Sequence, residues 1–106
     1  MKKNVISIIW VLLYIGANAQ TEGFVTDKFS TKNGDLTITF IGHASLMFEF
    51  QGKIIHIDPF SKVGDYSKLP KADLILLTHQ HRDHLDTVAM RLIVKPETDI
   101  WVSESC

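Results

Sequence analysis

The sequence is poor in cysteine, in long apolar runs and in charge of one sign. Its one cysteine, Cys106, is the last of 106 residues, so no disulfide can form within the chain and no cysteine lies near the N-terminus to carry a lipid. Lysine and arginine total 11 against 12 acidic residues, and the two signs are interspersed. No basic surface for nucleic acid is therefore expected, and a composition of 45% hydrophobic and 22% charged residues is typical of a globular domain.

The N-terminus has the three-part pattern of a secretory signal peptide. Two lysines precede an apolar stretch over residues 5–15, and the small-residue tripeptide Ala-Asn-Ala follows at 17–19. The apolar stretch is about half of the roughly 20 residues that a membrane-spanning helix needs, which favours a cleaved signal over an anchor. We expect residues 1–19 to be a signal peptide and residues 20–106 to be exported, to the periplasm or out of the cell, with no stable membrane anchor after cleavage.

Alternating apolar residues and turn dipeptides predict two successive β-hairpins. The expected strands cover residues 24–32, 35–41, 45–50 and 53–57. The first hairpin turns at Asn33-Gly34, a dipeptide that tolerates positive φ at both positions, and the second turns at Gln51-Gly52. Asp58-Pro59 ends the ladder, because proline has no amide hydrogen to donate.

The next part of the chain has a different pattern. After a polar loop, residues 73–77 (Asp-Leu-Ile-Leu-Leu) form a continuous apolar run that predicts a strand buried on both faces. Asp86 is expected to cap a short helix that ends before Pro96, and residues 99–103 predict another strand. This succession of strands and a helix predicts an α/β fold.

Four candidate metal ligands lie within six residues directly after the 73–77 strand: His79, His81, Asp83 and His84. Imidazole and carboxylate groups suit zinc and other borderline transition metals. On a helix His79 and His81 would diverge by about 200°, so both can reach one ion only from an extended segment or a loop. Asp83 and His84 follow as the chain turns and could hold a second ion, as two-metal hydrolases require. The ordered spacing after a buried strand disfavours the alternative of solvated surface histidines.

The pattern His79-x-His81-x-Asp83-His84 resembles the defining motif of the metallo-β-lactamase superfamily. The resemblance extends upstream through residues 41–45 (Ile-Gly-His-Ala-Ser), 57–59 (Ile-Asp-Pro) and 69–75, and it covers about residues 36–106. This longer pattern looks like the branch of the ascorbate-6-phosphate lactonase-like hydrolases and, more distantly, the N-acylphosphatidylethanolamine phospholipase D type enzymes. A true β-lactamase would share the motif and the export, but the upstream segments resemble the lactonase-like branch more closely.

The resemblance implies a role for each residue of the motif. His79 and His81 would ligate a first metal ion, and Asp83 and His84 a second. The complete site would hold two zinc ions, with other divalent transition metals as alternatives. Asp83 would also be the catalytic residue that orients the attacking hydroxide.

The resemblance also implies supporting roles behind the ligands. Asp58 would orient a ligating histidine and fix its tautomer, although an aspartate before proline is by itself typical of a turn. His43 is equally compatible with a turn residue and with a pocket residue that supports the ligands. Thr78 either donates to Asp58 or simply ends the strand, and Gln80 and Arg82 are expected to face away from the metals.

The fold that the resemblance implies is a four-layer αβ/βα sandwich with two similar halves, of which this chain would supply the N-terminal part. In the family a histidine, a bridging aspartate and a last histidine from later segments complete the site, and none has a match after His84. We therefore expect an N-terminal fragment of a longer hydrolase rather than a natural short protein, because one face of the sheet would stay uncovered. The implied function is metal-dependent cleavage of a small-molecule ester, lactone or phosphodiester. The alternative is a catalytically silent, truncated fragment that binds a metal weakly or pairs with another chain, such as a second copy of itself, to cover its exposed face.

Overall fold

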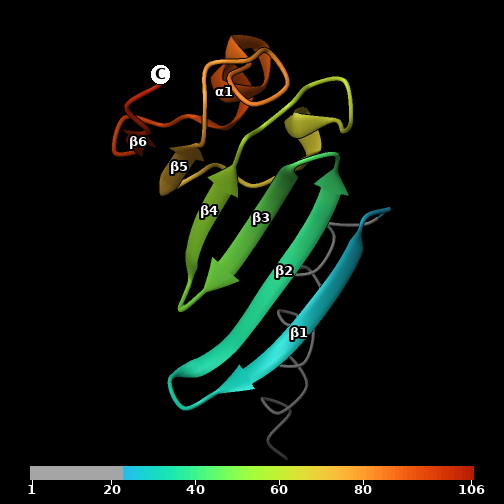
Figure 1. The fold of residues 1–106 in the computed structure, drawn as a ribbon. Helices are drawn as coiled ribbons and strands as arrows, with labels where there is room; N and C mark the ends of the chain where they lie inside the picture. The colour runs from blue at the N-terminus through green and yellow to red at the C-terminus, as the bar shows by residue number, and fades with distance from the viewer. Residues whose placement is uncertain (1–22) are drawn as a thin grey trace, which may run out of the picture.

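The fold is one mixed β-sheet with helices on one face. The computed structural model describes residues 23–106, and the predicted signal peptide lies outside this range. Within it, neighbouring strands follow each other along the sheet in chain order: β1 (Val25–Thr31), β2 (Gly34–Gly42), β3 (Ser45–Phe50), β4 (Lys53–Ile57), β5 (Leu74–Leu77) and β6 (Asp99–Val102) (Figure 1). The 3-10 helix η4 (Tyr66–Lys68) precedes β5, and the α-helix α1 (Thr87–Ile93) connects β5 to β6. The predicted α/β class is confirmed.

Strands β1 to β4 pair antiparallel, whereas β4, β5 and β6 pair parallel. Both predicted hairpins are present, but the first turn lies one residue earlier than predicted. Thr31 pairs with Gly34, so the turn residues are Lys32 and Asn33. Gly34 has a φ of 117°, while Asn33 does not have a positive φ. Glycine adopts this backbone conformation without the steric cost that a side chain would bring, and it can therefore start β2 directly after the turn.

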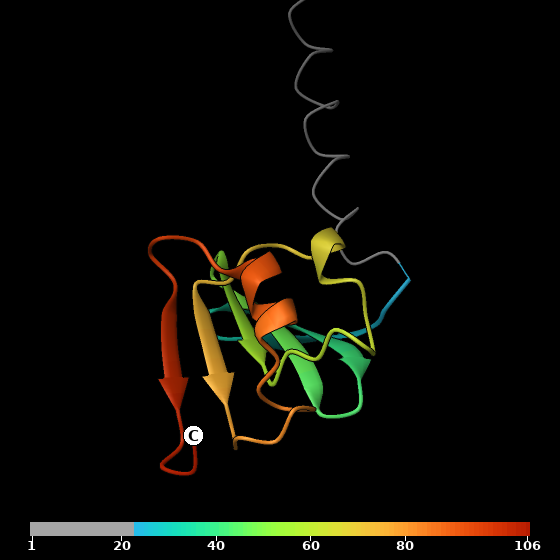
Figure 2. The same cartoon turned by 90° about the horizontal axis from the view of Figure 1, so that it is seen from above.

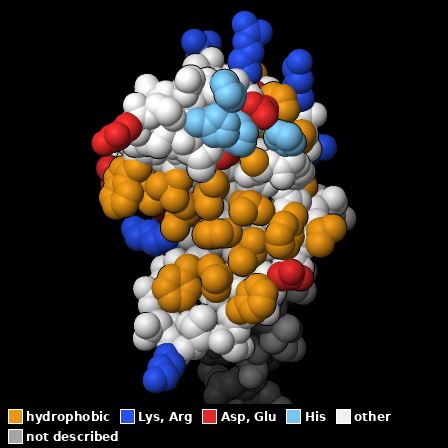
Figure 3. Space-filling view, in the orientation of Figure 1, with side chains coloured by type: hydrophobic (Ala, Val, Ile, Leu, Met, Phe, Trp, Pro, Cys, Tyr) orange, Lys and Arg blue, Asp and Glu red, His pale blue; other side chains and the backbone are white. Residues whose placement is uncertain are grey.

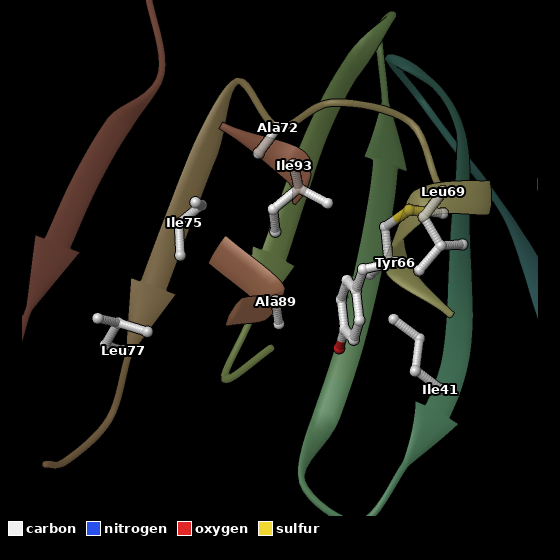
Figure 4. Close-up of a cluster of buried hydrophobic side chains, with 9 residues drawn as sticks. Ile41, Tyr66, Leu69, Ala72, Ile75, Leu77, Ala89 and Ile93 are labelled. Atoms are coloured by element: carbon white, nitrogen blue, oxygen red, sulfur yellow. The ribbon is translucent and has the colours of Figure 1, made fainter. Parts of the chain in front are cut away.

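Helices α1 and η4 lie on the same face of the sheet (Figure 2). Between them and the strands lies a core of buried hydrophobic side chains (Figure 4): Ile41, Met47, Tyr66, Leu69, Ala72, Ile75, Leu77, Ala89 and Ile93. Asp86 caps α1 as predicted, because its side chain accepts hydrogen bonds from the amides of Val88 and Ala89. Among the described residues, no helix combines the length and the apolar character that crossing a membrane requires.

The opposite face of the sheet is apolar and uncovered by any described segment. The strand registers place these side chains on it: Val25, Phe29, Leu36, Ile38, Phe40, Leu46, Phe48, Phe50, Ile55, Ile57, Leu74, Leu76 and Trp101. Figure 3 shows hydrophobic side chains spread across the strands. Leu74 and Leu76 are only half-buried, so the prediction that their strand is buried on both faces was wrong. The apolar run was read correctly as a strand, but the layer that would cover its second face is missing from the described residues.

Strand β4 carries a histidine that is fully buried in the core. His56 Nε2 is 3.0 Å from the carbonyl oxygen of Pro70, to which it can donate, and its Nδ1 has no hydrogen-bond partner among the described residues. Burial lowers the pKa of His56 to about 4, an effect that the hydrogen bond to Pro70 partly opposes. The imidazole is therefore neutral in the folded chain at neutral pH.

This histidine predicts a loss of stability in mild acid. An unfolded histidine takes up its proton near pH 6.5, whereas folded His56 takes it up only near pH 4, so acid favours the unfolded state between these values. The contribution of His56 to the free energy of unfolding has its full value above about pH 6.5, and it decreases by about 3 kcal/mol between pH 6.5 and pH 4. Urea unfolding of the metal-free chain from pH 7 to pH 4 measures it. His56→Gln, which keeps a donor for Pro70 but cannot be protonated, should show a shallower pH dependence; parallel profiles would contradict the prediction.

Candidate metal centre

Histidine and aspartate side chains gather at one edge of the sheet, where three connections meet. Figure 3 shows the histidines grouped at this edge, with acidic side chains beside them. The connections are the turn between β2 and β3, the segment after β4, and the loop that leads from β5 to α1. All six residues singled out from the sequence lie in these connections: His43, Asp58, His79, His81, Asp83 and His84.

The tightest group combines two imidazoles with a carboxylate. His43, Asp83 and His84 each offer a ligand atom, and these atoms lie within 4.8 Å of one another. Asp83 Oδ2 is 2.8 Å from His43 Nε2 and 3.3 Å from His84 Nε2. The hydrogen bond from His43 lowers the pKa of Asp83 below its ordinary value, so this carboxylate is ionised at neutral pH. Two imidazoles and a carboxylate at this spacing fit a zinc ion or a similar divalent metal.

His79 and His81 lie beside this group. The His79 ring lies against the His84 ring, with centroids 3.7 Å apart, and His81 meets His79 edge-on at 4.9 Å. The rings of these two alternate histidines thus lie next to each other on an irregular segment. Within the described residues, the close ligand group contains His43 and not these two, so their assignment as metal ligands stays a prediction.

Asp58 is a buried residue next to the site. Its Oδ1 accepts from the Thr78 amide at 2.8 Å, and its Oδ2 lies 2.5 Å from the Thr78 hydroxyl and 2.7 Å from His84 Nδ1. Asp58 thus contacts one of the predicted metal ligands, and its role in orienting that ligand stays a prediction. The backbone takes φ 46°, which aspartate and asparagine tolerate better than most residues. If His84 Nδ1 donates to Asp58 across this contact, Nε2 of a neutral His84 ring carries no hydrogen.

A pocket of about 410 Å³ lies next to this site. Phe60 and Lys62 line it from the segment after β4, and Arg82 lines it from the loop after β5. None of the candidate ligands lines this pocket, but two of its lining residues are their neighbours: the Phe60 ring lies 6.3 Å from the His43 ring, and Arg82 directly precedes Asp83 in the chain. Sequence reasoning missed Phe60 and Lys62, because they belong to no motif and only the fold brings them to Arg82.

The chain resembles proteins that are named as metal-dependent hydrolases. A UPF0173 metal-dependent hydrolase of Flavobacterium johnsoniae is 50% identical over an alignment of 56 residues, and the match covers 47% of this chain and 24% of the relative. One from Thermodesulfovibrio yellowstonii is 34% identical over an alignment of 93 residues, and the match covers 80% of this chain and 29% of the relative. The chain thus spans about a quarter of the length of these relatives.

A solved structure and a family model also match this chain. A crystal structure from Parabacteroides distasonis, described as that of a metal-dependent hydrolase, matches 73% of this chain and 36% of its own with 50% identity and a TM-score of 0.70. The model of the beta-lactamase superfamily domain matches residues 37–97, which is more than half of the chain and includes the motif after β5. The chain therefore belongs to the beta-lactamase superfamily.

Proposed function

We propose that this chain carries the metal-binding part of a hydrolase that cleaves an ester, lactone or phosphodiester with water. The observation that carries the proposal is the meeting of His43, Asp83 and His84 at the end of β5, with Asp58 behind them. The relatives' names support a divalent metal as cofactor. We propose zinc, with two ions in the complete site, because imidazole and carboxylate are its common ligands in hydrolases.

Each side chain has a part in the proposed reaction. When bound, metal ions of this kind lower the pKa of water and polarise the bond that is attacked. His79, His81, Asp83 and His84 would hold the metal ions, and His43 would support this group through its contact with Asp83. The ionised carboxylate of Asp83 would also accept a hydrogen from the attacking water and so orient it. Asp58 would keep His84 in the tautomer that can bind a metal.

The pocket beside the site suits a small-molecule substrate. Its volume is in the range of ligand pockets, and its lining combines apolar residues such as Phe60 with the charged residues Lys62, Arg82 and Asp86. We place the enzyme in the lactonase-like branch, on the segments around His43 and Asp58 that resemble it. Export through the predicted signal at residues 1–19 would bring the reaction to the periplasm or outside the cell.

The experiment that tests the proposal is a hydrolysis assay on the metal-stripped chain with and without added zinc. Nitrophenyl esters, simple lactones and bis-nitrophenyl phosphate cover the three bond types. We expect zinc-dependent turnover that a chelator removes and that Asp83→Asn abolishes. A chain that binds zinc but hydrolyses none of these bonds above the zinc-only background would contradict hydrolysis by this chain alone, and a chain that binds no zinc would contradict the proposal as a whole.

A second candidate function rests on the uncovered sheet face. Val25 is 71% exposed and Trp101 is 65% exposed, and apolar side chains lie between them across all six strands. Soluble proteins rarely leave so large an apolar face in water. The second candidate is a catalytically silent metal-binding chain that pairs with another copy through this face. If the same zinc-loaded sample sedimented as a dimer and hydrolysed none of the test substrates, the result would favour this second candidate over the enzyme.

A further inference from the structure

One hydroxyl group lies between the buried carboxylate and two of the predicted metal-ligating histidines. Thr78 is the first residue after β5, and its Oγ1 is 2.5 Å from Asp58 Oδ2. The same oxygen is 3.0 Å from His79 Nδ1 and 3.4 Å from His84 Nδ1. Thr78 therefore contacts every member of this small network, and the amide of Thr78 binds the second oxygen of Asp58.

The direction of each hydrogen bond follows from counting hydrogens. A hydroxyl group has one hydrogen to donate, and a carboxylate can only accept. The hydrogen of Thr78 Oγ1 is therefore directed to Asp58, which is also its shortest contact. In the contact with His79, Thr78 Oγ1 must be the acceptor, so His79 Nδ1 must be the donor. The hydrogen on Nδ1 leaves the lone pair of Nε2 free when His79 is neutral.

His84 is held in the same tautomer by a direct contact. Its Nδ1 lies 2.7 Å from Asp58 Oδ2, so this nitrogen also carries a hydrogen and donates it. The two histidines differ in how they are linked to Asp58. His84 contacts the Asp58 carboxylate directly, whereas His79 is linked to it only through the hydroxyl of Thr78. Removing that hydroxyl should therefore affect His79 and spare His84.

We propose that Thr78 is a positioning residue that fixes the tautomer of His79, so that one buried carboxylate prepares both histidines to bind a metal through Nε2. The statement about metal binding rests on the proposed function. The tautomer itself does not, because it is a property of the metal-free chain. Neither the sequence motif nor the relatives' names assign this threonine a role toward His79.

Two variants of Thr78 separate the hydroxyl from the shape of the side chain. Thr78→Val keeps the branched shape and the backbone amide but has no hydroxyl, whereas Thr78→Ser keeps the hydroxyl. Nitrogen-15 NMR of the histidine rings, at about pH 8 where ordinary imidazoles are neutral, reports which ring nitrogen carries the hydrogen. Zinc titration of the same samples gives the affinity, and urea unfolding gives the stability.

In the unaltered chain and in Thr78→Ser we expect His79 and His84 both to carry the hydrogen on Nδ1. In Thr78→Val we expect His79 to shift toward the Nε2 form while His84 stays unchanged, with zinc affinity about 10- to 100-fold lower. The inference is overturned if His79 carries its hydrogen on Nε2 in the unaltered chain, or if Thr78→Val changes both histidines alike, as general loosening would. A chain with the expected tautomers that binds no zinc would contradict the proposed function and leave the role of Thr78 in the tautomer intact.

Discussion

Asp83→Asn is expected to lower the affinity of the chain for zinc by at least about 100-fold, since losing even a supporting partner of a ligand commonly costs 10- to 100-fold. Asp83 supplies the carboxylate of the tightest ligand group, with Oδ2 close to ring nitrogens of both His43 and His84. Asparagine has nearly the same shape but no charge, and its amide nitrogen cannot act as a ligand. Calorimetric titration of zinc into the metal-stripped chain measures the effect.

The change should leave the fold intact, which makes the result easy to interpret. The side chain of Asp83 is 37% exposed, and its contacts are with histidines of the site rather than with the core. Asp99→Asn is the matched control, because Asp99 is an exposed carboxylate at the start of β6, away from the site. Equal zinc affinity in the Asp83 and Asp99 variants would show that the motif after β5 does not bind the metal through this carboxylate.

Asp58→Asn is expected to affect both stability and zinc binding. Asparagine replaces one carboxylate oxygen with an NH2 group, which donates hydrogen bonds. If that group faces the Thr78 amide, two donors oppose each other in a buried place, at a cost of about 1–3 kcal/mol in the free energy of unfolding. If it faces His84 instead, the imidazole must accept at Nδ1 and carry its hydrogen on Nε2, which blocks the ligand atom. Either arrangement weakens the site.

Urea unfolding of the metal-free chain and zinc titration measure the two effects of Asp58→Asn separately. We expect about 1–3 kcal/mol lower stability together with about 10- to 100-fold weaker zinc binding. Asparagine tolerates the positive φ at this position as aspartate does, so backbone strain does not explain a loss. Asp27→Asn, a change of an exposed carboxylate on β1, is the control. If the Asp58 variant matched this control in both measurements, Asp58 would support neither the stability of the chain nor its zinc site.

Much of the fold follows from local patterns in the sequence. Glycine-containing turns and alternating apolar residues predict the antiparallel strands, and Asp86 marks the start of α1. These features depend on neighbours within a few residues, so local reasoning is enough for them. The first hairpin turn lies one residue before its predicted place. The dipeptide Asn33-Gly34 can fill both turn positions, or it can supply the last turn position and the first residue of the next strand.

The exposure of β5 could not be read from its residues. An apolar run such as the one in β5 is typical of a strand covered on both sides, but covering depends on which other segments pack against it. In the described residues α1 and η4 cover one face only, and Leu74 and Leu76 point to the other. Sequence pattern reports what a strand can bury, whereas the packing of distant segments decides what it does bury.

The sequence by itself determined the α/β class, the strands and helix, and the cluster of candidate metal ligands after β5, because each of these depends on consecutive residues. Only the tertiary structure decided how the site is assembled. It brings His43 to Asp83, 40 residues away, and Asp58 to His84, 26 residues away. A turn, a buried carboxylate and a histidine motif meet there because the sheet places the ends of β2, β4 and β5 at the same edge, and such long-range proximity depends on packing that no local pattern records.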